Sequence, residues 1–183
     1  MDRLRVLIAG VALALLTTQA LAGSRAIELP ITTAAATAGD ARPIKLDATA
    51  WALLKSVNDE VNRRIQPITD KDHWGVPERW DLPSDGKGDC EDYALLKQKI
   101  LIEKGFPVGA LLMTVVIDRD GAGHAVLTAV TDRGDFVLDN QDETILPWLD
   151  TGYRFVKRQS MQDPNVWAVV GAPLRDPVAT AAK

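Results

Sequence analysis

The chain has 183 residues, a formal net charge of −4 and a hydrophobic content of 46%. This length and composition suit one globular domain with a substantial hydrophobic core. The mild acidity and the lack of a dense stripe of Lys and Arg argue against nucleic acid as a partner, because phosphate binding needs clustered positive charge.

The N-terminus has the three-part pattern of a secretory signal peptide. A positively charged start precedes an apolar run over residues 6–16, and Ala20 and Ala22 form a small-x-small motif with cleavage expected after Ala22. We therefore predict a signal peptide over residues 1–22, export, and a periplasmic location. An uncleaved anchor is the alternative, although the run is short for a bilayer, and no later segment is predicted to span a membrane.

A globular domain is predicted over residues 45–171, between a flexible leader at 23–44 and a disordered tail at 172–183. The leader is rich in Ala and Thr and carries no apolar period. The domain opens with an amphipathic helix, which Asp47 is placed to cap and Pro67 to end. Its apolar residues recur at three- and four-residue spacing: Trp51, Leu54, Val57, Val61 and Ile65.

Residues 69–88 are predicted to form a long loop, which its Trp and Pro residues fold against the body of the domain. A second helix is predicted over residues 90–104, directly after Asp89. Asp89 is a good N-cap residue, and Asp92 stands three residues later in a position like that of a capping box.

The chain beyond Pro107 changes to strand-like patterns rich in Val, Leu and Thr. Helices therefore come first and an antiparallel meander follows, which is the order typical of the α+β class. The predicted strands cover residues 111–117, 124–131, 136–139, 153–159 and 166–170.

Cys90 is the single cysteine, so an internal disulfide is excluded and an exported chain would carry a free thiol. At a helix start, backbone N–H groups lower the pKa of a thiol and can donate to an oxyanion, as a cysteine acyl-transfer enzyme requires. The flanking acids Asp89 and Glu91 raise that pKa, so a bound cation or a nearby imidazolium must offset them. A small buried hydrophobe is the alternative interpretation of Cys90.

His124 is the candidate base for the thiol, since the chain has two histidines and His73 lies in the Trp-rich loop, where it could be a surface residue. His124 opens a predicted strand after a glycine-rich turn. A strand-borne imidazole facing a helix-borne thiol is the papain-like arrangement.

Asp139, at the end of the next predicted strand, is the candidate group that orients the imidazole. If the intervening turn is centred on residues 133–134, Asp139 lies about 13 Å along the sheet from His124. If the turn is centred on residues 132–133, the two are diagonal neighbours with Cα atoms about 7–8 Å apart. Both registers place them on one face of the sheet. A turn-forming role is the alternative for Asp139.

The acids around the thiol also resemble a set of calcium ligands. Asp89, Glu91 and Asp92, with Asp70 and Asp72 in the preceding loop, offer carboxylate oxygens, although not at EF-hand spacing. Simple solvent exposure of these acids is the alternative. One cysteine and two well-separated histidines do not make a zinc site.

Three segments together resemble the bacterial transglutaminase-like cysteine proteinases of the LapG type. They read GDCEDYA at residues 88–94, GHAVL at 123–127 and VLDN at 137–140. The resemblance extends over residues 47–170. It is nearer to the shorter members of the family, because the segment between Trp80 and Gly88 is short beside the LapG type.

This resemblance implies a papain-like fold, periplasmic location and a triad of Cys90, His124 and Asp139. It also implies calcium held beside the nucleophile by Asp89 and Glu91. Proteases of the LapG type cleave a surface adhesin, which releases cells from a biofilm, and an inner-membrane receptor that senses cyclic di-GMP can sequester them.

We therefore expect an exported cysteine protease that hydrolyses a periplasmic or cell-surface protein, with a biofilm adhesin as a candidate. Two alternatives stay open from the sequence. The same triad could transfer the acyl group to an amine on protein or cell-wall peptide, as in a transglutaminase or amidase. The chain could instead be a calcium-dependent binding module without activity, against which the intact Cys, His and Asp argue.

Overall fold

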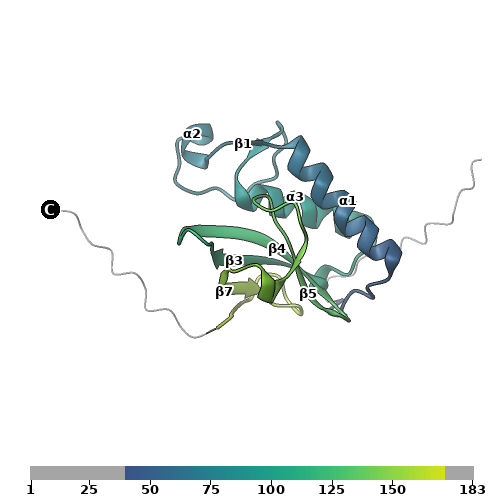
Figure 1. Ribbon diagram of the computed structural model, residues 1–183. Coiled ribbons are helices and arrows are strands. Elements are labelled where there is room, and N and C mark those ends of the chain that lie inside the picture. The colour runs from purple at the N-terminus through teal and green to yellow at the C-terminus, as the bar shows by residue number, and fades with distance from the viewer. Residues whose placement is uncertain (1–39, 172–183) are drawn as a thin grey trace, which may run out of the picture. The chain divides into compact units, whose positions relative to one another are not determined.

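The computed structural model describes residues 40–171. The predicted signal peptide, most of the predicted leader and the predicted tail lie outside the described residues. Two helices, α1 (Ala48–Arg64) and α3 (Cys90–Glu103), lie on the same side of an antiparallel sheet (Figure 1). The predicted α+β fold class is therefore confirmed.

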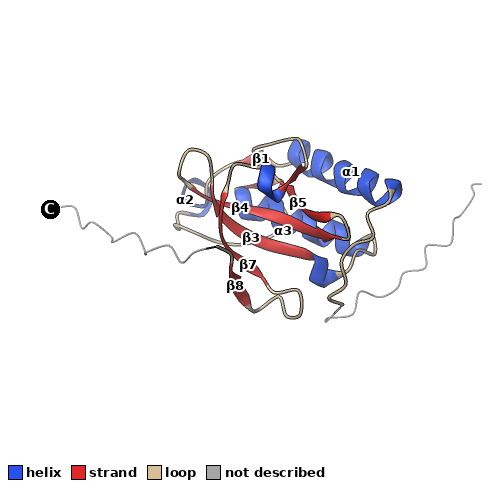
Figure 2. Cartoon of the chain, turned by 60° about the horizontal axis from the view of Figure 1, so that its bottom comes forward, coloured by secondary structure: helices blue, strands red, loops and turns tan. Residues whose placement is uncertain are grey.

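The main sheet has the strand order β6-β5-β4-β3-β7-β8. Its strands, seen in red in Figure 2, are β3 (Leu111–Ile117), β4 (Gly123–Thr131), β5 (Gly134–Leu138), β6 (Leu146–Pro147), β7 (Arg154–Gln159) and β8 (Trp167–Val169). Two single turns of 3₁₀-helix, η1 (Val108–Ala110) and η2 (Trp148–Asp150), precede β3 and β7.

The predicted simple meander holds only from β3 to β6. After β6 the chain crosses the sheet, and β7 pairs with the free edge of β3 rather than with β6. β3 is buried along most of its length. Pairing with β7 satisfies the backbone N–H and C=O groups of its edge, which would otherwise be open to pairing with another chain.

The loop predicted at residues 69–88 contains structure that the sequence pattern did not reveal. A short helix, α2 (Asp70–Trp74), begins at Thr69 and ends at Gly75, whose φ of +75° is the left-handed conformation that glycine adopts easily. Two short parallel strands, β1 (Gln66–Pro67) and β2 (Lys87–Gly88), close the segment. This closure brings α2 to the N-terminal end of α3, where the Asp70 amide donates to Asp89 Oδ2 at 3.2 Å.

Helix α1 forms as predicted and supports the segment that follows β5. The Asp47 carboxylate accepts a hydrogen bond from the Ala50 amide at 2.8 Å and caps the helix. Two asparagine side chains on its buried face donate to distant carbonyl groups. Asn62 donates to Asp139 at 2.7 Å and Asn58 to Glu143 at 3.2 Å. Helix α1 thus fixes the backbone at and after Asp139.

The main core joins α1, α3 and the sheet, and its first member in the chain is Ile44. Ile44 is buried, its amide donates to the Val130 carbonyl and its carbonyl accepts from the Asp132 amide. The packed domain thus begins one residue before the predicted boundary at 45. A smaller cluster of Val116, Val126 and Val137 packs with Trp148, Tyr153 and Phe155.

Lys97 is a charged side chain inside this core, with 1% of its surface exposed. Burial lowers the pKa of its ammonium group to about 7, and the negative charge of Asp139 opposes that shift. Among residues 40–171, no helix is long and apolar enough to cross a membrane.

Replacing Leu54, which is fully buried on α1, with Ala should lower the free energy of unfolding by about 2–5 kcal/mol, because it leaves a cavity in the core. Chemical denaturation measures the change. Leu149→Ala is the matched control, since Leu149 is 76% exposed and should change stability little. Equal losses in the two variants would contradict the described core.

Lys97→Met should raise the free energy of unfolding above that of the natural chain. The gain should be largest at pH 7 and below and should shrink toward pH 10. The folded-state pKa lies below the unfolded value, so the unfolded chain binds more protons between the two, and the cost of burying Lys97 disappears as pH rises. Denaturation curves at several pH values measure the difference. Lys99→Met, on the exposed face, should show no such gain, and a gain for Lys97→Met that stays constant with pH would refute the assignment.

Candidate active site

Cys90 is the first residue of α3 and is partly buried. The predicted side-chain cap at Asp89 is wrong, because the Asp89 carboxylate forms no capping bond to the helix. Its Oδ2 atom accepts instead from the Asp70 amide, which α2 brings to this point. The backbone amides in the first turn of α3 therefore donate no hydrogen bond to the Asp89 carboxylate, which the sequence had suggested as their acceptor.

The thiol lies in surroundings that disfavour its ionised form. Burial raises the pKa of Cys90 to about 12, a hydrogen bond from the Ala125 amide opposes the rise, and the charges of Glu91 and Asp89 add to it. The thiol donates to Glu91 Oε2 at 3.2 Å. A thiolate at neutral pH therefore needs a positive charge close by. The sequence led to the same expectation, because Asp89 and Glu91 flank the thiol.

His124 and Asp139 are brought together by the pairing of β4 with β5. Leu127 lies opposite Leu138, which is the register of a turn centred on residues 132–133. Asp139, directly after β5, then lies diagonal to His124, and His124 Nε2 is 2.8 Å from Asp139 Oδ1. Both side chains are buried.

The state of the Asp139 carboxylate decides which ring nitrogen of His124 carries hydrogen. Burial raises the pKa of Asp139, but hydrogen bonds from His124 and Tyr153 outweigh it and hold that pKa below its usual value. An ionised carboxylate can only accept, so in the neutral imidazole tautomer that fits this bond Nε2 carries the hydrogen and Nδ1 has the lone pair. The Gln141 side-chain amide lies 3.4 Å from Nδ1.

Cys90 and His124 line one cleft of about 800 Å³. The backbone of Ala125, next to His124, lines the same cleft and opposes the rise in the pKa of Cys90. Trp80 and Trp167 form an aromatic wall, with ring centroids 5.8 Å apart at a steep angle. The structure therefore places the two reactive side chains on a surface large enough for a short peptide segment.

Three acidic side chains converge beside Cys90. Carboxylate oxygens of Asp70, Asp89 and Glu91 lie within 4.8 Å of one another. Two buried oxygens, Asp89 Oδ1 and Glu91 Oε1, find no hydrogen-bond partner among residues 40–171. Burial raises the pKa of Glu91 to about 8. Buried oxygens are rarely left unpaired, and three converging carboxylates fit a hard cation such as calcium.

Other acids and the second histidine have different roles. Asp92 accepts from the Asp81 amide at 3.0 Å, and Asp72 bonds the Thr69 hydroxyl at the start of α2. His73 bonds Asp85 at 2.9 Å and stacks on the neighbouring Trp74 ring. Asp70 joins the acidic cluster because of α2, which gave no periodic signal in the sequence.

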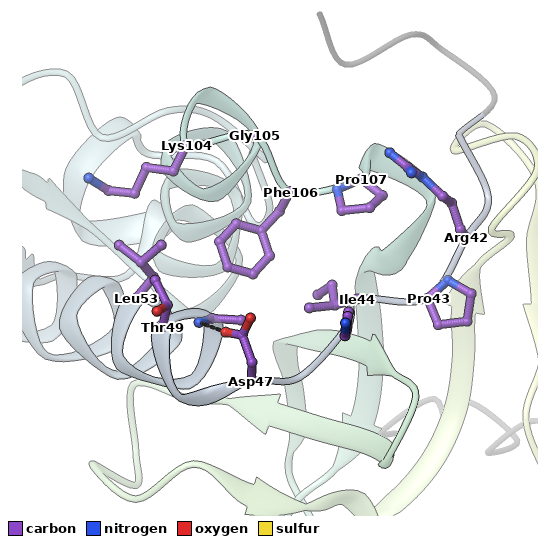
Figure 3. A pocket seen from close by; sticks show the side chains of 12 residues that line it. Arg42, Pro43, Ile44, Asp47, Thr49, Leu53, Lys104, Gly105, Phe106 and Pro107 are labelled. Carbon is purple, nitrogen blue, oxygen red and sulfur yellow. Dashed lines mark hydrogen bonds between the residues drawn. The ribbon is translucent and has the colours of Figure 1, made fainter. Parts of the chain in front are cut away.

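Another cavity, of about 370 Å³, lies at the opposite end of α3 (Figure 3). Lys104, Gly105 and Phe106 line it from the end of the helix, and Arg42 and Asp47 lie on the other side. Neither Cys90 nor a histidine lines this cavity.

A model of the bacterial transglutaminase-like cysteine proteinase family matches residues 31–174. Among solved structures, LapG from Legionella pneumophila aligns with a TM-score of 0.53 and 26% identity, over 60% of this chain and 64% of that chain. An EGTA-treated form of the Legionella protein aligns with a TM-score of 0.53 and 26% identity, over 60% of this chain and 62% of that chain.

A calcium-bound form of the same Legionella protein aligns with a TM-score of 0.58 at 21% identity, over 75% of this chain and 77% of that chain. The alignment to the first LapG structure spans less than two thirds of its length. No curated protein matches the sequence.

Proposed function

The chain belongs to the bacterial transglutaminase-like cysteine proteinases, and on that premise we propose that it hydrolyses peptide bonds with Cys90, His124 and Asp139 as its catalytic triad. The family makes it a cysteine peptidase. One observation supports the triad above all: His124, which is bonded to the buried Asp139 carboxylate, lines the same cleft as the only cysteine.

In the proposed reaction, His124 Nδ1 takes the thiol proton while Asp139 holds the hydrogen on Nε2 and stabilises the imidazolium that forms. The thiolate attacks the carbonyl carbon of the scissile peptide bond. His124 then gives the proton to the departing amine, which leaves a thioester on Cys90. Water, deprotonated by His124, attacks the thioester and releases the new carboxyl terminus.

Backbone amides would stabilise the oxyanion of the tetrahedral intermediate. The first turn of α3 has amides that the Asp89 side chain does not cap, and the Ala125 backbone lowers the pKa of the thiol. Donors fixed in the backbone need no rearrangement when negative charge develops, which is why such sites favour the transition state.

We propose that Asp70, Asp89 and Glu91 hold a calcium ion beside Cys90. The converging carboxylates with two unpartnered oxygens support this assignment, and calcium is present in one LapG structure. Bound there, the ion supplies positive charge that neutralises the acids flanking the thiol. Asp70 extends the pair of ligands, Asp89 and Glu91, that the sequence resemblance implied.

The substrate we propose is a periplasmic or cell-surface protein, with a biofilm adhesin as a candidate and an inner-membrane receptor as a candidate regulator. These assignments follow the family resemblance and the predicted signal peptide over residues 1–22. The open cleft and its aromatic wall suit a peptide segment with an apolar side chain near the scissile bond.

Cys90→Ala and His124→Ala should each abolish the release of protein fragments when the purified chain is added to cells that lack it. Proteomic comparison of the released proteins measures the loss. His73→Ala is the matched control, because it removes the other histidine, which bonds Asp85 away from the cleft.

Undiminished release by Cys90→Ala would refute the mechanism. Adding a primary amine distinguishes hydrolysis from acyl transfer: an amine-modified terminus in place of a free carboxyl group would identify a transglutaminase-type reaction.

Calcium should raise the melting temperature of the natural chain, and the rise should be lost in Glu91→Gln and in Asp70→Asn. A ligand that binds only the folded state stabilises it by mass action, by about 2.7 kcal/mol at a hundred times its dissociation constant. Thermal unfolding with calcium and with chelator measures this. Asp120→Asn, an exposed acid in the β3–β4 turn, should keep the full shift, and an equal shift in all variants would exclude the proposed ligands.

A further inference from the structure

The Asp139 carboxylate has a partner that the triad does not include. Its Oδ1 atom accepts from His124 at 2.8 Å and from the Gln141 amide at 2.9 Å, whereas Oδ2 accepts from the Tyr153 hydroxyl at 2.6 Å. The last distance lies in the range of charge-assisted O–H···O⁻ bonds, which are about twice as strong as neutral ones.

Tyr153 is itself held in place from several directions. Thr151 Oγ1 accepts from the Tyr153 amide at 3.1 Å, and Arg119 Nε donates to the Thr151 carbonyl at 2.8 Å. The Arg119 guanidinium lies 5.3 Å from the centroid of the tyrosine ring. The ring also packs against the cluster of Val116, Val126 and Val137. These contacts fix the position of the hydroxyl group.

A fixed hydroxyl matters because the terminal torsion of an aspartate is broad. With bonds to one oxygen alone, the carboxylate could rotate and carry the His124 ring with it. Bonds to both oxygens, from His124 in β4 on one side and from Tyr153, just before β7, on the other, leave one orientation. The rings of Tyr153 and His124 also meet edge to face, with centroids 5.8 Å apart.

Resting on the proposed triad, we propose that Tyr153 is a positioning residue whose hydroxyl locks the Asp139 carboxylate against His124. The locked carboxylate keeps hydrogen on Nε2 of His124 and leaves Nδ1 free to take the thiol proton. Tyr153 does not line the Cys90 cleft, so it acts through Asp139. Burial and the bond to Asp139 raise the pKa of its hydroxyl group, so it remains a donor throughout the neutral range.

Alkylation of Cys90 by iodoacetamide tests this role without knowledge of the substrate, and the single cysteine makes mass-spectrometric detection specific. At pH 7 with calcium, Tyr153→Phe should react about tenfold more slowly than the natural chain, a factor typical of losing a hydrogen bond to a charged group. Phenylalanine keeps the ring and removes only the hydroxyl group.

The other tyrosine provides the matched control. The Tyr93 hydroxyl also makes a 2.6 Å bond, to the Ile65 carbonyl in the main core. Tyr93→Phe should lower the melting temperature but leave the alkylation rate within twofold of the natural value. Similar slowing in both variants, or an unchanged rate in Tyr153→Phe, would overturn the proposal.

Two further variants separate this proposal from the triad. In an Asp139→Ala background, Tyr153→Phe should slow alkylation by less than twofold, since there is no carboxylate left to lock. The same tenfold loss in both backgrounds would overturn the positioning role. If Asp139→Ala does not fold, the two Phe variants decide alone. If Cys90 in His124→Ala were alkylated as fast as in the natural chain, the triad itself would be refuted.

Discussion

The pairing of β4 with β5 is the constraint on which the site depends. With Leu127 opposite Leu138, Asp139 leaves the strand diagonal to His124, and the two side chains meet at 2.8 Å. A shift of one residue would turn every β5 side chain to the opposite face, and a shift of two would carry Asp139 out of reach. The tight turn between the strands therefore fixes the contact between His124 and Asp139 as well as the topology.

Local patterns predicted most of the elements but little of how they meet. The period of α1, its Asp47 cap and the main strands are properties of short segments, and the structure confirms them. Two turn positions fitted the sequence equally well, so the register stayed open until the strands were paired. The crossing to β7, the five-residue α2 and the bond from Tyr153 to Asp139 depend on contacts between distant segments, and no local period encodes these.

Electrostatics at Cys90 combine opposing demands. The helix start and the Ala125 amide favour a thiolate, while burial and two carboxylates oppose it more strongly. The same carboxylates, with Asp70, form a cluster whose unpartnered oxygens suit a cation. Charge at the nucleophile is therefore set jointly by the acids, by whatever cation they bind and by His124. The position of Asp89 alone suggested a simple cap, which the structure replaces with a contact to α2.

The amide of Asn62 links α1 directly to the Asp139 carbonyl, and Asn58 holds the same segment four residues later. The segment that carries the Asp139 carboxylate is thus held by a helix that does not line the Cys90 cleft. Partial detachment of α1 would release the segment that carries Asp139 while most of the sheet remained intact. Under the proposed triad, activity would report on the docking of this helix, and local opening would inactivate the domain before it unfolded as a whole.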